Sequence, residues 1–392
     1  MTPPSPCGIP LRLKRSAACS RAAVGAVGAP RPAGFRLPAV RALLLAVGLG
    51  SAIGPARAIV FFATDDPTHN TTAPTGDFAE SGWRWQGNWR GFAGTVIGTN
   101  WFLTAQHLGG EVGEEFMLEG EGYRTTAFFD DPETDLRLWR VCRPFASSAP
   151  LHGAANEAGR VCVLFGRGLA RGAEVTLTNA GQTELRGWYW GPNAGPLRWG
   201  LNRIAGYENL GSHAGVLLRG TFDATGGADE AMLAGGDSGG GLFIEHGGRW
   251  ELAGIAYAVD GPFSYTAEGP GFHAALFDCR GFHQEATDGW VPVAVGPLPQ
   301  PAAFYASRVS VRRVWIEETM AANPEPEPVP VVLSGSRANG PFAPVPATVD
   351  AADHEIRIAR PADSSFFQLS ACRALRIVRL MLAGDELVMG YE

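Results

Sequence analysis

The chain has 392 residues, a formal net charge of −7, 52 glycines and 29 prolines. This length accommodates a two-lobed domain and a smaller one, and the many glycines and prolines suit a loop-rich all-β protein. Eight basic residues and no acidic ones lie in the first 58 positions, so removing those eight positive charges takes the net charge from −7 to −15. The chain beyond residue 58 is therefore strongly acidic, which argues against nucleic acid or an anionic membrane as a partner.

The first 58 residues have the pattern of an export signal. A basic segment precedes an apolar run at 42–53, which is too short to span a membrane and has the length of a signal-peptide core. Ala56-Arg57-Ala58 fits the cleavage site that follows such a core. We predict a leader at 1–58, cleavage after Ala58, and a secreted or periplasmic protein with no membrane insertion afterwards. The alternative is an uncleaved, disordered basic tail.

Two candidate catalytic side chains stand beside predicted strands. Residues 94–103 form two short apolar runs around a Gly-Thr-Asn turn, and His107 follows them. Asp135 directly precedes a mainly apolar stretch, and Asp130 and Asp131 are rival carboxylates. Taken singly, a surface histidine or a loop aspartate would give the same pattern.

A third candidate, Ser238, lies in the glycine-rich segment 235–240, ahead of a predicted hairpin with strands at 241–244 and 250–256. A serine hydroxyl is a weak nucleophile at neutral pH, so it needs a base within hydrogen-bond reach and a third group that orients the base. His107 and Asp135 have the required chemistry. In isolation, the glycine-rich segment is also typical of an ordinary turn.

Three motifs resemble those of the chymotrypsin/trypsin-like serine protease family and occur in that family's order. They are W-F-L-T-A-Q-H at 101–107, D-L-R-L-W-R-V at 135–141 and G-D-S-G-G at 236–240. Residues 304–310 and 314–320 are similar to the family's last strand and closing helix. The resemblance implies an all-β fold of two six-stranded antiparallel β-barrels with a C-terminal helix.

The resemblance also implies roles for the candidate residues. His107 would be the general base, Asp135 the group that orients it, and Ser238 the nucleophile that becomes acylated. The backbone N–H groups of Gly236 and Ser238 would form the oxyanion hole. This chemistry requires no cofactor and takes polypeptides as substrates.

The specificity pocket departs from the family's pattern. Met232 stands six residues before the serine, where trypsin has an aspartate, and Tyr257, Ala258 and Val259 occupy the wall strand. Val259 replaces a glycine that keeps the family's pocket open. We therefore predict preference for small or medium apolar residues, and we expect the long insertion at 260–301 to shape the cleft.

The family also suggests how the chain becomes active. Cleavage after Ala58 would leave Ile59-Val60 at the N-terminus, and in this family such a terminus inserts beside the aspartate that precedes the serine. That aspartate is Asp237 here, although Phe61-Phe62 replaces the usual Gly-Gly. The alternative is that Ile59 simply begins the first strand and that Asp237 has other partners.

Four of the six cysteines lie beyond the leader, a number that permits two disulfides in any of three pairings. These cysteines are Cys142, Cys162, Cys279 and Cys372. No C-x-x-C and no clustered Cys/His spacing occurs, so the sequence predicts no metal site.

Aromatic residues are dense at 187–203, which predicts either a filled barrel core with a hairpin turn at 192–195 or a substrate or carbohydrate platform. We predict a protease domain at 59–322, a Pro/Glu linker at 323–330 and a small β module at 331–392. The module could contact polysaccharide, aid anchoring or protect the carboxyl end.

The combined motifs predict a secreted serine endopeptidase. The competing hypothesis is an inactive barrel of the same fold that binds a ligand or carbohydrate through its aromatic surface and C-terminal module.

Overall fold

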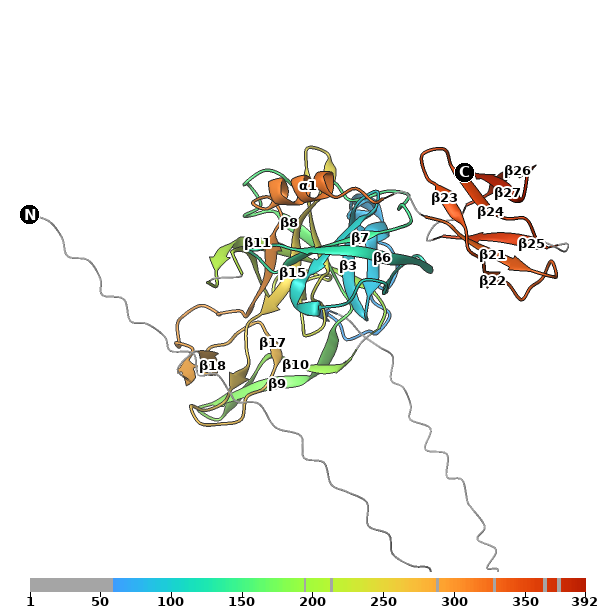
Figure 1. The fold of residues 1–392 in the computed structure, drawn as a ribbon. Coiled ribbons are helices and arrows are strands. Elements are labelled where there is room, and N and C mark those ends of the chain that lie inside the picture. The colour runs from blue at the N-terminus through green and yellow to red at the C-terminus, as the bar shows by residue number, and fades with distance from the viewer. Residues whose placement is uncertain are drawn as a thin grey trace, which may run out of the picture. The chain divides into compact units, whose positions relative to one another are not determined.

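The computed structural model describes residues 59–193, 195–211, 214–286, 289–326, 329–361, 365–371 and 375–392. The leader predicted at 1–58 therefore lies outside the described residues. Strands dominate the described part, and none of its helices is long and apolar enough to cross a membrane. Two closed six-stranded antiparallel barrels form its centre, which confirms the predicted fold class (Figure 1).

The first barrel has the closed strand order β2-β3-β4-β7-β6-β5. Its strands are β2 (Gln86–Trp89), β3 (Phe92–Gly98), β4 (Trp101–Ala105), β5 (Glu115–Leu118), β6 (Glu121–Asp130) and β7 (Leu136–Val141). Large aromatic side chains fill the interior, including the fully buried Trp89, Phe102, Phe116 and Trp139. Since each buried aromatic ring removes a large apolar area from water, these four rings account for much of the barrel's core. The predicted strand pair at 94–103 is confirmed as β3 and β4.

The second barrel has the closed order β11-β12-β20-β15-β14-β8. Its strands are β8 (Val161–Gly166), β11 (Arg198–Asn209), β12 (Val216–Thr221), β14 (Gly241–His246), β15 (Arg249–Val259) and β20 (Ala303–Arg308). The predicted hairpin after the serine is confirmed as β14 and β15. Its turn is tight because Gly247 and Gly248 both take positive φ, at 62° and 83°.

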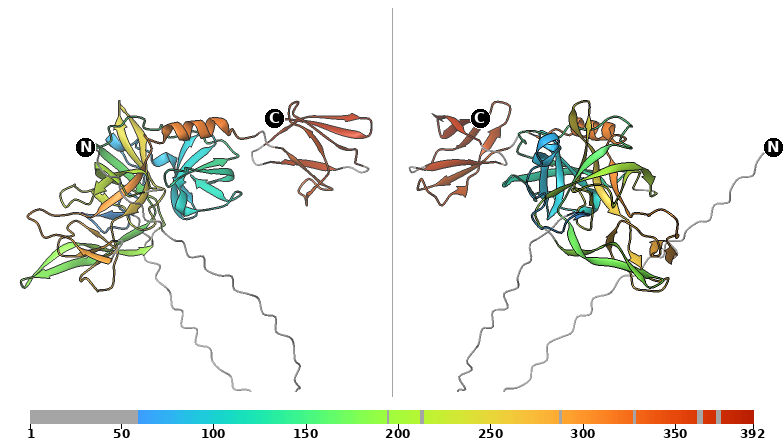
Figure 2. Two further views of the ribbon diagram at one scale, coloured as in Figure 1. Left: turned by 60° about the vertical axis from the view of Figure 1, so that its left-hand side comes forward. Right: turned by 180° about the vertical axis from the view of Figure 1, so that it is seen from behind.

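The two barrels pack against each other through a common buried cluster, and Figure 2 shows them side by side. Val163, Phe243 and Ile255 of the second barrel belong to the same buried cluster as the first barrel's interior. The closing helix α1 (Arg313–Ala322) buries Ile316 in that cluster. Strand β1 (Val60–Phe61) pairs with β13 (Ala231–Met232), which leads toward the serine.

A third group of strands extends from the second barrel and is labelled at the bottom of Figure 1. One sheet has the order β17-β10-β9, and another has the order β16-β18-β19. Their strands are β9 (Leu169–Asn179), β10 (Gln182–Asn193), β16 (Phe263–Ser264), β17 (Ala274–Leu276), β18 (His283–Ala286) and β19 (Gly289–Pro292). Strands β16 to β19 come from the predicted insertion, which is therefore structured, and β17 pairs with β10.

The aromatic segment at 187–203 divides between two sheets. Trp188 on β10 and Trp199 on β11 are buried, as the core hypothesis requires. The predicted hairpin turn at 192–195 is wrong, because β10 pairs with β9 and β17 whereas β11 pairs with β8 and β12.

The C-terminal residues form two small antiparallel sheets of orders β22-β21-β25 and β23-β24-β27-β26. Their strands are β21 (Val331–Gly335), β22 (Ala343–Pro344), β23 (Thr348–Asp350), β24 (Glu355–Ala359), β25 (Phe366–Ser370), β26 (Ile377–Ala383) and β27 (Glu386–Tyr391). The predicted β module is thus made of strands, with its own buried cluster around Ile356 and Met389. Its boundaries, and those of the linker, remain predictions.

Candidate active site

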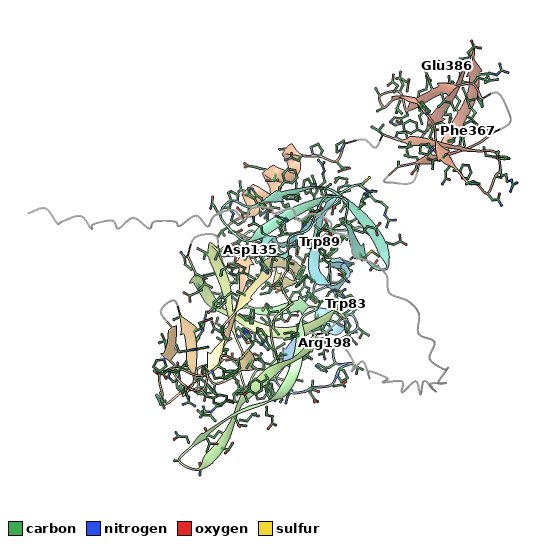
Figure 3. All side chains as sticks on the ribbon, turned by 60° about the horizontal axis from the view of Figure 1, so that its bottom comes forward. Trp83, Trp89, Asp135, Arg198, Phe367 and Glu386 are labelled. Atoms are coloured by element: carbon green, nitrogen blue, oxygen red, sulfur yellow. The ribbon has the colours of Figure 1, made fainter. Side chains whose placement is uncertain are left out.

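Paired strand ends of the first barrel bring His107 and Asp135 together. Ala105, the last residue of β4, lies opposite Leu136, the first residue of β7. The side chains that follow β4 and precede β7 therefore emerge at one edge. Nδ1 of His107 lies 2.6 Å from Oδ2 of Asp135, and the His107 backbone N–H donates to Oδ1 at 3.0 Å. These two bonds fix both the position and the orientation of the imidazole. Figure 3 labels Asp135 on the first barrel, together with Trp89 of its core.

Ser238 reaches the same point from the second barrel. It lies on the loop between β13 and β14, and its Oγ is 2.9 Å from Nε2 of His107. The side chain of His107 is 41% exposed and that of Asp135 only 11%, so the histidine faces the solvent side and the carboxylate lies behind it. The three candidate residues form one continuous hydrogen-bonded chain across the two barrels.

The rival carboxylates are engaged elsewhere. Asp131 is buried and accepts hydrogen bonds from the Arg312 guanidinium at 2.6 and 2.7 Å. Asp130 forms a two-point ion pair with Arg137. Both therefore stabilise local structure, and neither contacts His107.

The glycines beside Ser238 allow its loop to fit between the barrels. A Cβ on Gly239 would collide with the carbonyl oxygen of Ala93 in the first barrel, and one on Gly240 would collide with the carbonyl oxygen of Phe165 in the second. Gly236 has φ +91°, a backbone conformation that residues with a Cβ atom rarely adopt. Within the described part of the chain, the N–H groups of Gly236 and Ser238 donate to no backbone or side-chain acceptor. Both donors thus remain available to a bound group.

Asp237, which precedes the serine, is fully buried among backbone donors. Its carboxylate accepts from the N–H of Gly168 at 2.6 Å and of Ala234 at 2.7 Å. Burial raises the pKa of Asp237 to about 7, although hydrogen bonds from the N–H groups of Ala234, Gly168 and Ile59 act in the opposite direction. Ile59 itself is completely buried beside this carboxylate.

One of three comparisons with known proteins assigns the chain to a family. The model of the family described as Trypsin matches residues 75–278, just over half of the 392 residues. This chain belongs to the trypsin family. The search of curated proteins found no match. Among solved structures, the chain is similar to neuropsin, a serine protease expressed in the limbic system of mouse brain, with 16% identity and a TM-score of 0.38 over 62% of this chain and 96% of that one.

Beside the serine, this member of the trypsin family has a small cavity of about 70 Å³. It is lined by Leu233, Ala234, Gly235, Asp237, Ser238, Ala256, Tyr257, Ala258 and Val259. The three residues predicted on the wall strand, Tyr257 to Val259, do line it. The lining offers no arginine or lysine, and its one ionisable carboxyl, Asp237, is held by backbone donors.

The prediction that Met232 forms part of this pocket is wrong. Met232 is fully buried, pairs with Val60 and lies in the core of the second barrel. Leu233 lines the cavity in its place. Counting back from the serine identified the correct segment, but the pairing of β13 with β1 turns Met232 toward the core.

Other contacts around the site could not be found from local sequence. Gly168, whose N–H binds Asp237, lies in the turn between β8 and β9, 69 positions earlier in the chain. The Trp190 ring covers Gly235, since a Cβ on that glycine would lie 3.1 Å from the ring. Trp190 also stacks on His273 from the insertion, with ring centroids 4.7 Å apart. In the sequence, these positions show only a glycine and an aromatic residue, and neither indicates a contact with the site.

Two of the described cysteines take no part in a disulfide. Cys162 and Cys279 are free and buried, and burial raises the pKa of both thiols, that of Cys162 to about 12. Each of the three predicted pairings uses Cys162 and Cys279, so none of them is confirmed. A bond between Cys142 and Cys372 would need only the other two cysteines, and Cys372 lies outside the described residues. That pairing remains a prediction.

Proposed function

We propose that this protein is a secreted serine endopeptidase that hydrolyses peptide bonds through an acyl-enzyme on Ser238. The observation that carries the proposal is the unbroken hydrogen-bonded chain from Asp135 through His107 to Ser238, with separations of 2.6 and 2.9 Å. Family membership supports polypeptides as the substrate class. The leader predicted at 1–58 supports export.

In the proposed reaction, Nε2 of His107 takes the proton of the Ser238 hydroxyl as its oxygen attacks the substrate carbonyl carbon. Asp135 keeps the proton of the imidazole on Nδ1 and stabilises the imidazolium that forms. His107 then gives its proton to the leaving amine. Water, deprotonated by the same histidine, hydrolyses the ester and restores Ser238.

The oxyanion of the tetrahedral intermediate would accept hydrogen bonds from the N–H groups of Gly236 and Ser238. Both groups are without another acceptor among the described residues, and the positive φ of Gly236 presents its N–H beside the serine. Loss of one such donor typically lowers turnover by about 100–1000-fold. The loop geometry around Asp237 thus matters directly for rate.

We further propose that cleavage before Ile59 activates the enzyme. Ile59 has φ +56°, a left-handed conformation that is strained for a β-branched residue. A free N-terminus has no preceding carbonyl carbon and therefore no such strain. Its ammonium group would also face Asp237, a buried carboxyl whose hydrogen-bond partners in the described part of the chain are backbone N–H groups, with Arg198 as a weaker charge interaction.

The dimensions of the pocket favour small apolar side chains at the residue before the cleaved bond. A buried arginine or lysine would find no free carboxylate there, and an unpaired buried charge costs several kcal/mol. Leu233 and Val259 are among the residues that line this cavity of about 70 Å³.

A fluorophosphonate probe tests the proposal most directly, because it labels an activated serine and leaves an unactivated one unlabelled. We expect one label per chain, on Ser238, and none in Ser238→Ala or His107→Ala. An unlabelled but folded wild-type protein, prepared with Ile59 as its first residue, would favour the inactive binding protein instead.

A further inference from the structure

Three side chains from two distant segments converge on the side of the second barrel, away from the residues of the candidate active site. They are His152, from the segment that joins the two barrels, and His246 and Glu251, from the β14–β15 hairpin. Their ligand atoms all lie within 4.8 Å of one another. From this convergence we propose that His152, His246 and Glu251 bind a divalent transition-metal ion, Zn²⁺ first among them.

The donor set decides the class of ion. Two imidazole nitrogens and one carboxylate oxygen suit Zn²⁺ and its transition-metal neighbours, whereas Ca²⁺ and Mg²⁺ prefer oxygen ligands alone. Oε2 of Glu251 is the centre of the cluster, 2.8 Å from Nδ1 of His152 and 3.3 Å from Nδ1 of His246. Ligand atoms of a tetrahedral zinc ion with bonds of about 2.0–2.1 Å lie about 3.3 Å apart. The histidine on β14 already meets that spacing, and His152 needs to withdraw by about 0.5 Å.

Backbone contacts hold the cluster in place. His152 donates its N–H to the carbonyl of Leu252 at 2.9 Å, and Leu151 forms a parallel bridge with the same residue. His152 is therefore fixed beside Glu251 although the two residues are 99 positions apart. On the hairpin, His246 pairs with Arg249, and Glu251 lies two residues beyond Arg249 on the same strand. Side chains two residues apart on a strand point to the same face, so His246 and Glu251 share one face of the hairpin.

The surroundings of the carboxylate leave one oxygen for an ion. Arg249 donates from Nε to Oε1 of Glu251 at 2.6 Å, on the oxygen that faces away from the two histidines. Such a hydrogen bond to a ligating carboxylate is a usual feature around metal sites.

The exposure and the hydrogen-bond partners of the two histidines indicate how an ion would enter the cluster and how tightly it would bind. The side chain of His246 is 37% exposed and that of His152 is fully buried, so an ion would enter beside His246 and water would complete its coordination. Nε2 of His152 has no hydrogen-bond partner among the described residues. Since such outer partners strengthen metal binding by about 10–100-fold, we expect weaker binding than at fully supported zinc sites. A bound ion would fasten the inter-barrel segment to the hairpin.

The test is thermal unfolding of the chelator-treated full chain with added ZnCl₂, together with the visible absorption of bound Co²⁺. Zinc should raise the melting temperature steadily with its concentration, by roughly 5–10 °C at about a hundredfold excess over Kd, and Ca²⁺ or Mg²⁺ should not. His246→Asn should remove both the stabilisation and the Co²⁺ absorption. This variant should fold, because His246 is partly exposed.

His354→Asn is the matched control, since His354 is exposed, lies in a different part of the fold and has φ +51°, which asparagine tolerates. It should respond to zinc as the wild type does. An unchanged melting temperature in wild-type protein, or the same zinc response in His246→Asn, would overturn the proposal.

Discussion

Adding one residue before Ile59 should make the stability of the folded protein depend on pH in a way that the chain with a free Ile59 does not. In a chain that continues through Ile59, Asp237 is buried with no ion-pair partner among the described residues, the charge of Arg198 acts on it only weakly, and its pKa rises from 3.8 to about 7. A rise of that size corresponds to about 4 kcal/mol between the charged and neutral forms. The extended chain must meet this cost wherever Asp237 is ionised.

The sign of the pH dependence follows from proton binding. Between pH 4 and 7 the folded extended chain keeps the Asp237 proton that the unfolded chain has lost, so its stability falls as the pH rises through that range. The contribution of this bound proton to the stability of the extended chain is fully present below about pH 4 and is lost above about pH 7. A free Ile59 ammonium would pair with the carboxylate, lower its pKa and remove most of this fall.

The assay compares urea unfolding of the two chains from pH 5 to 8, both carrying Ser238→Ala to prevent self-digestion. Their free energies of unfolding should diverge as the pH rises, with the extended chain the less stable by up to about 4 kcal/mol at pH 8. In the catalytic background the extended chain should also be much less active, because Asp237 adjoins both proposed oxyanion donors. Parallel pH profiles combined with equal activities would refute this reasoning while leaving the proposed triad intact.

Other changes test the site and its pocket. Asp135→Asn should fold normally but lose about four decades of turnover. Asp131→Asn should destabilise the fold by roughly 3–5 kcal/mol through loss of its arginine pair, and its folded molecules should keep their activity. If kinetics and unfolding showed the reverse pattern, the assignment of Asp135 as the partner of His107 in catalysis would be wrong. Val259→Gly should enlarge the cavity and shift cleavage of a peptide library toward larger residues, and an unchanged profile would place the specificity pocket elsewhere. Cys162 and Cys279 should resist alkylation in the native protein and react once it is unfolded; rapid native labelling would contradict their burial.

The sequence was most informative where the candidate site is built from short segments beside strands. His107, Asp135 and Ser238 could be predicted because each stands within a motif whose neighbouring strand is also visible in the pattern of apolar residues. The barrels followed from the same motifs. The structure adds the pairing of β4 with β7, which brings the first two residues to one edge.

Prediction failed where a residue's role depends on partners distant in the chain. Met232 is turned into the core by pairing with Val60, a contact that spacing from the serine does not reveal. The cluster of His152, His246 and Glu251 has no sequence signature, because its members lie up to 99 positions apart and meet only through the barrel's register. The free thiols likewise reflect where the strands place them.

The pairing of β10 with β17 makes the two unusual segments of this protein a single unit. Trp188 of the 169–193 hairpin packs against Phe277 of the insertion, and Arg186 forms an ion pair with the buried Asp278. Deleting either segment alone would uncover apolar rings and break this ion pair, although Asp278 would keep Arg280 and Arg186 would keep Glu184 as partners. Truncation or transplantation to another barrel should therefore succeed only when both segments move together, and with them goes the Trp190 ring that covers the loop beside the serine.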